Sequence, residues 1–165
     1  MKKLAQVLKA LAGALLLIGV LLTFAAVIAR RVFNNSIIWS EEAVRYMFIW
    51  MFFLAMPICT MKGEHIALDI LGTHIHGRAK SIYLIIVEVI CIVLDIAIVK
   101  LGFPYALGNM NQKSAALHIP YGYINIAIPI GALLMIIFSI YRIYLLATGK
   151  VDPEAASEDG KEEQQ

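Results

Sequence analysis

The stretch LAGALLLIGVLLTFAAVIA at residues 11–29 contains no charged side chain. Three further apolar stretches follow it, at residues 43–61, 82–99 and 124–146. As helices rising about 1.5 Å per residue, each is long enough to cross a hydrocarbon core of about 30 Å. The sequence therefore predicts an all-α integral membrane protein with four transmembrane helices.

Composition supports this fold class, because 61% of the 165 residues are hydrophobic and the mean hydropathy is +0.79. A water-soluble bundle of four such helices would lack polar surface. Residues 1–149 are expected to form one four-helix membrane domain, and residues 150–165 a disordered, acidic cytoplasmic tail. The first stretch exceeds the core of a signal peptide, so we expect a retained helix.

The distribution of lysine and arginine predicts the orientation of the helices in the membrane. With a cytoplasmic N-terminus, nine basic residues fall on the cytoplasmic side and four on the opposite side. The nine are Lys2, Lys3, Lys9, Lys62, Arg78, Lys80, Arg142, Lys150 and Lys161, and the four are Arg30, Arg31, Lys100 and Lys113. Both termini are therefore expected in the cytoplasm.

The first connection ends with Trp39, whose amphipathic ring suits the membrane interface. Ser40 then reads as a helix cap, and Glu41 and Glu42 suit the positive end of the helix dipole. The second connection, residues 62–80, has two interpretations. Residues 65–71 either lie on the membrane surface as a short helix or form a loop folded against the spans. The third connection, residues 100–123, is rich in glycine, proline and asparagine, although the preceding helix can extend into it.

Three ionisable residues, Arg45, Glu88 and Asp95, are expected to lie within the hydrocarbon, whereas Arg142 near the end of the fourth span is counted with the cytoplasmic charges. A charge at the bilayer centre costs about 2.5–3.5 kcal/mol on insertion scales, so each needs a partner. Estimated depths place Arg45 level with Asp95, and Glu41 or Glu42 can also reach Arg45 along one helix face. We therefore predict a structural ion pair at Arg45.

Glu88 and Asp95 share one face of the third span, because seven residues separate them. This face has three interpretations. It holds a structural ion pair, it docks on a partner subunit, or it relays protons or cations. The prolines at positions 57 and 129 lie within the second and fourth spans, where structural kinks are expected.

No cofactor, metal site or enzymatic activity is predicted. The two cysteines, Cys59 and Cys91, fall inside spans without ligand spacing and read as small apolar fillers. A haem held between membrane helices needs histidines in the spans. All four histidines lie outside the predicted spans.

The segment RVFNNSIIWSEEAVRY at residues 31–46 resembles the small permease subunit of tripartite ATP-independent periplasmic (TRAP) transporters, the DctQ type. Its most specific part is Trp39-Ser40-Glu41-Glu42 followed by Arg45. Residues 63–69, 114–120 and 128–131 resemble later parts of the family pattern, so the resemblance covers roughly residues 10–147.

The resemblance implies a non-catalytic scaffold in the bacterial inner membrane. Its implied partners are a large permease subunit, a periplasmic solute-binding protein and membrane lipid, and not nucleic acid. The implied process is uptake of an organic acid, such as a C4-dicarboxylate or sialic acid, driven by an ion gradient. Candidate residues for structure or partner contact are Trp39, Glu41, Glu42, Arg45, Glu88 and Asp95. Two alternatives remain open, a membrane anchor of a redox enzyme and an autonomous small channel.

Overall fold

The computed structural model describes residues 2–33, 37–62 and 78–148. Its helices are α1 (Lys2–Val32), α2 (Ile38–Lys62), α4 (Arg78–Gly108), α5 (Tyr121–Asn125) and α6 (Ala127–Ala147). These helices provide four segments long and apolar enough to cross a membrane, with α5 and α6 acting together as the fourth. The predicted four-helix membrane fold is confirmed. The expectations for residues 65–71 and 150–165 lie outside the described residues.

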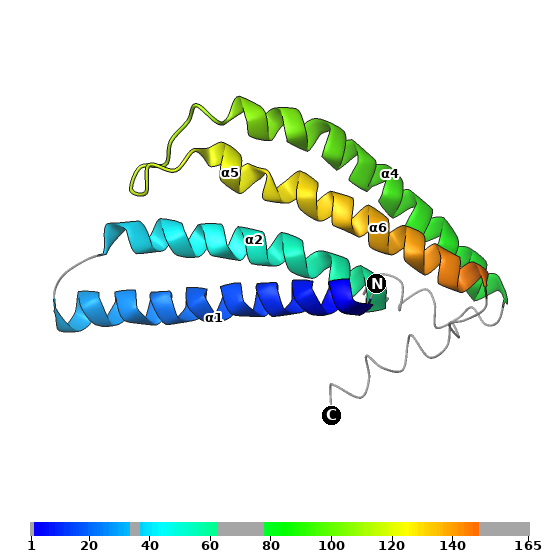
Figure 1. Cartoon of the computed structure of the whole chain (residues 1–165), viewed down its shortest axis with the longest axis horizontal. Coiled ribbons are helices and arrows are strands. Elements are labelled where there is room, and N and C mark those ends of the chain that lie inside the picture. The colour runs from blue at the N-terminus through cyan, green and yellow to red at the C-terminus, as the bar shows by residue number, and fades with distance from the viewer. Residues whose placement is uncertain (1, 34–36, 63–77, 149–165) are drawn as a thin grey trace.

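The long helices form a row in which α1 packs on α2, α2 on α6, and α6 on α4 (Figure 1). Two ends are named along the helix axes. We call the end of the row at which α1 starts and α6 ends the terminal end. The opposite end, with the end of α1, the start of α2 and residues 109–120, is the loop end. Large apolar side chains remain exposed along the two outer helices, among them Leu17 and Phe24 of α1 and Val93 and Leu101 of α4. In a membrane, these faces contact lipid or another protein.

The third helix extends into the third connection, as the sequence allowed, and one other helix boundary differs from the expected one. The α4 helix continues to Gly108, through Pro104, so only residues 109–120 connect α4 to α5. The α2 helix begins at Ile38, which places Ser40 inside the first turn instead of at the cap. The Ser40 hydroxyl donates a hydrogen bond to the Ile37 carbonyl at 2.7 Å, so the predicted capping of an amide by Ser40 is wrong.

Prolines shape the two central helices. Pro57 lies buried within α2 and lacks the N–H that would bond the Phe53 carbonyl one turn earlier. Pro129 lies buried in the first turn of α6, and the structure divides the fourth span into α5 and α6 at Ile126. Ile126 lies three residues before Pro129, and a proline ring disturbs the helical turn that precedes it.

Glycines allow the helices to approach closely. A Cβ atom added at Gly131 of α6 would lie 2.9 Å from both the Cβ and the carbonyl oxygen of Phe53 in α2. A Cβ atom added at Gly102 of α4 would lie 3.2 Å from Cδ of Pro129 in α6. Small residues at such crossings let membrane helices pack backbone against backbone. The contact between Gly131 and Phe53 therefore fixes where α6 packs on α2.

We expect Gly131→Ala to destabilise the protein, because the new methyl group collides with the α2 backbone. Gly13→Ala is the matched control, because no atom lies within 4 Å of a Cβ added there. Replacing a helical glycine by alanine otherwise gains about 1 kcal/mol. The free energy of unfolding in mixed detergent should therefore be lower than that of the wild type for Gly131→Ala and higher for Gly13→Ala. Equal stabilisation by both substitutions would contradict the close packing of α2 on α6.

Candidate functional site

A buried ion pair joins the helices near the terminal end of the row. Arg142 Nη1 of α6 donates a hydrogen bond to Glu88 Oε1 of α4 at 2.8 Å. The same nitrogen donates to the Thr60 carbonyl of α2 at 3.3 Å. The Glu88 side chain is 1% exposed and the Arg142 side chain 9% exposed. One guanidinium thus links three of the four spans.

This pair realises one of the predicted explanations for Glu88, a structural ion pair, with a partner that sequence reasoning missed. Arg142 was assigned only to the count of cytoplasmic charges, although it lies within the predicted fourth span. A signal was present in the sequence. Glu88 lies six residues from the start of its span and Arg142 four from the end of its own, which are similar depths in antiparallel helices.

Arg45 does not form the predicted ion pair. Its side chain is exposed on α2, whereas Asp95 is buried on α4, with α6 lying between these helices in the row. Among the described residues, no salt bridge joins Arg45 to Asp95, Glu41 or Glu42. The predicted equal depth is also wrong, because Asp95 lies thirteen residues from the end of α4 at Gly108, whereas Arg45 lies seven residues from the start of α2 at Ile38.

Glu42 anchors the connection between α4 and α5 to α2 at the loop end. Its carboxylate accepts hydrogen bonds from the Ala116 N–H at 3.2 Å and the Leu117 N–H at 3.0 Å. The connection is closed on itself, because the Ser114 N–H donates to the Ile119 carbonyl at 2.9 Å. Sequence reasoning placed Glu42 at the start of a helix and did not anticipate that it binds loop amides.

The loop backbone has an unusual conformation beside this anchor. His118 has a φ of 56°, in the left-handed region that non-glycine residues seldom adopt. The Tyr46 ring of α2 meets the Tyr121 ring edge to face, with centroids 6.4 Å apart. Contacts with α2 on both sides of His118 therefore hold the loop in a defined shape.

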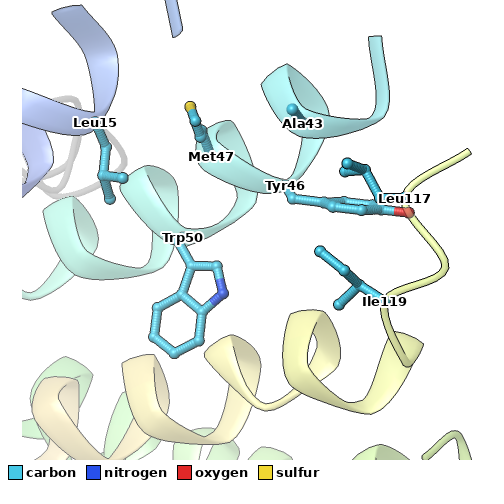
Figure 2. A pocket seen from close by; sticks show the side chains of 7 residues that line it. All are labelled: Leu15, Ala43, Tyr46, Met47, Trp50, Leu117 and Ile119. Atoms are coloured by element: carbon cyan, nitrogen blue, oxygen red, sulfur yellow. The ribbon is translucent and has the colours of Figure 1, made fainter. Parts of the chain in front are cut away.

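Between this loop and the first two helices lies an apolar pocket of about 510 Å³ (Figure 2). Figure 2 shows Leu15 entering from α1, Tyr46 reaching towards Leu117, and Trp50 directed towards α6. The lining residues are Leu15, Ala43, Tyr46, Met47, Trp50, Leu117 and Ile119. This lining suits hydrocarbon rather than a charged solute.

The other predicted residues near the loop end are exposed. Trp39 lies in the first turn of α2 with its ring partly free, as an interfacial position requires. Glu41 and Arg30 approach to 3.9 Å, with side chains 72% and 61% exposed. Such a pair contributes little to stability in water. Within the described parts of the chain, no group of three or more His, Cys, Asp or Glu side chains is placed to hold a metal ion.

Comparison with known proteins decides the family. Residues 19–149 match the model of the family described as "Tripartite ATP-independent periplasmic transporters, DctQ component". This chain belongs to the DctQ family. The resemblance of residues 31–46 to the small permease subunit is thus confirmed. The chain is a membrane permease component of the TRAP type, located in the inner membrane.

Curated DctQ relatives are similar at modest identity. The sialic acid TRAP transporter small permease SiaQ of Vibrio cholerae is 24% identical over 117 residues, 71% of this chain and 68% of the relative. The C4-dicarboxylate small permease DctQ of Vibrio cholerae is 33% identical over 76 residues, 46% of this chain and 33% of the relative. The isethionate permease DctMQ of Oleidesulfovibrio alaskensis is 30% identical over 105 residues, 59% of this chain but 16% of that longer protein.

We predict that Glu88→Gln destabilises the fold by about 3–5 kcal/mol, because it leaves the buried Arg142 without its counter-charge. Replacing both residues by leucine should cost less than the two single changes added together. Reversible unfolding in detergent gives each free energy, and Glu41→Gln is the control for an exposed carboxylate. Additive effects of the two leucine changes would mean that Glu88 and Arg142 do not interact.

Glu42→Gln should loosen the connection between α4 and α5, since a neutral amide oxygen accepts the two loop N–H groups less strongly than a carboxylate. The Ala116 and Leu117 amides are then expected to exchange with deuterium roughly tenfold faster. Hydrogen exchange read by mass spectrometry measures this rate, with Glu41→Gln as the neighbouring control. Unchanged exchange at both amides would remove Glu42 as the anchor.

Proposed function

We propose that this chain is the scaffold subunit of a TRAP-type importer that takes up an organic acid using an ion gradient. The observation that carries the proposal is the family match across residues 19–149, which includes the second half of the first span and all of the other three. The buried Glu88–Arg142 pair supports a structural contribution, because its two charges neutralise each other inside the chain.

The shape of the chain supports a scaffold that works with a partner. A row of helices buries the inner faces of α2 and α6 but leaves broad apolar faces on α1 and α4. A large permease subunit in the same membrane is the partner that we propose for one of these faces.

Longer relatives support this pairing. The chain matches 16% of DctMQ and 18% of the sialic acid permease SiaT of Haemophilus influenzae, so both relatives join a DctQ-like stretch to a much longer permease. Two components made as one polypeptide work side by side. In this chain we propose that the large component is a separate subunit, served by a periplasmic solute-binding protein.

The substrate class follows from the relatives' names, which print sialic acid, C4-dicarboxylate and isethionate. All three are organic anions, so we propose that the substrate here is an organic anion, taken up by using an ion gradient as the resemblance implies. No observation favours the alternatives, a redox-enzyme anchor or an autonomous channel.

Reconstitution tests the proposed function. Proteoliposomes holding this chain alone should show no organic-acid uptake above empty liposomes under a sodium gradient. Adding the proposed large permease subunit, together with the binding protein, should produce uptake that stops when the gradient is collapsed. Uptake by this chain alone would refute the scaffold proposal and favour the channel.

We further propose that the exposed Arg45 contacts the large subunit. Arg45→Ala should lower the fraction of assembled complex, and uptake should fall in proportion to it. Arg30→Ala is the control, because it removes an exposed arginine near the same end of the row. The measurement is uptake per intact complex at several substrate concentrations. Normal assembly with a many-fold higher half-saturation concentration would show instead that Arg45 binds substrate.

A further inference from the structure

The buried polar groups between α4 and α6 extend beyond the ion pair. Glu88 and Asp95 lie on α4, and Ser139 and Arg142 on α6, and all four are nearly closed to the surroundings. We call these four residues the polar seam. Three of its oxygen atoms have no hydrogen-bond partner, namely Glu88 Oε2, Asp95 Oδ2 and Ser139 Oγ. Burying such atoms without partners costs free energy, so each calls for a donor or a proton.

The helix register places Ser139 between the two acids. Antiparallel α4 and α6 meet at Glu88 with Arg142 and again at Gly102 with Pro129. Ser139 precedes Arg142 by one turn on the same face, which sets it opposite the interval between Glu88 and Asp95. Glu88 and Asp95 are themselves two turns apart, about 10 Å along α4.

Three possible partners for the Asp95 carboxylate are excluded, two by this spacing and one by burial. The guanidinium of Arg142 is held at Glu88, so it does not reach an oxygen two turns away. A hard metal cation gathers about six or more oxygen ligands, and the two acids are too far apart to share one. A side chain from a partner subunit meets a closed surface, because Asp95 is only 4% exposed in the chain itself.

A proton needs only one oxygen to bind. We propose that Asp95 is a proton-binding site, occupied by one proton taken from water, with Ser139 lying between it and the Glu88–Arg142 pair. The seam then carries no net charge, since Glu88 and Arg142 cancel and Asp95 is neutral. This inference goes beyond the assignment as a transporter subunit and does not depend on the substrate.

The groups around Asp95 are consistent with this state. On α4 its titratable neighbours are Glu88 and Cys91, and α6 presents Ser139 and Arg142 to the same seam. The α5 helix packs on α4 at Ala106, eleven residues beyond Asp95. No described cation other than Arg142 belongs to the seam, so an ionised Asp95 would leave it with an uncompensated negative charge.

Infrared spectroscopy of the full-length chain in lipid tests the proposal. At pH 6, exposed carboxyl groups with ordinary pKa values near 4 are ionised, so a protonated carboxylic acid stands out. We expect the wild type to show a carboxylic acid C=O band that Asp95→Asn removes. Glu41→Gln, which removes an exposed carboxylate and leaves the seam intact, is the control and should retain that band. A wild-type minus Asp95→Asn spectrum containing only ionised carboxylate bands would overturn the proposal.

The unfolding equilibrium of Asp95→Asn, compared with that of Glu88→Gln, provides a second readout. Asparagine resembles a neutral aspartic acid in shape and charge, so Asp95→Asn should change the unfolding equilibrium constant by less than about threefold. Glu88→Gln, which breaks a buried pair, should change it by about a hundredfold or more. If Asp95→Asn fails to fold or is as disruptive as Glu88→Gln, Asp95 is a required negative charge and the proposal is wrong.

Discussion

The contact of Arg142 with Glu88 and the Thr60 carbonyl is the constraint on which the arrangement of the helices depends. A guanidinium in hydrocarbon must have its charge compensated and its donors occupied. Glu88 supplies the charge from α4, and Thr60 supplies a backbone acceptor from the end of α2. Satisfying one side chain therefore fixes the positions of α2, α4 and α6 relative to one another at the terminal end of the row.

Packing and hydrogen bonding complete the arrangement away from this pair. Gly131 brings α6 against the Phe53 backbone of α2, at the carbonyl that Pro57 leaves without its usual helical partner. At the loop end, the Glu42 carboxylate binds amides of the 109–120 connection. Contacts between elements far apart in sequence thus recur along the row, and none of them requires a second chain.

A self-sufficient inner row fits a scaffold subunit. Glu88 and Arg142 are compensated within the chain, while the outer faces of α1 and α4 consist of large apolar side chains. Such faces gain little by meeting each other but can pack against another membrane protein by shape. The structural ion pair and the proposed proton-binding Asp95 can occupy one helix interface, because Glu88 and Asp95 lie two turns apart on α4.

Hydrophobic length in the sequence was sufficient to predict four spans, because crossing a bilayer sets a minimum length for each helix. The motif around Trp39, Glu41, Glu42 and Arg45 identified the family. Pairings between helices were not predictable, since depth and spacing limit which charges can meet but not which helices are neighbours. The depths of Arg45 and Asp95 match only if α4 ends at residue 99; because α4 continues to Gly108, Asp95 lies deeper, and the row also places α6 between the two helices. Only tertiary structure gave Glu88 its partner Arg142 and Glu42 its loop amides, because both contacts join residues more than fifty positions apart.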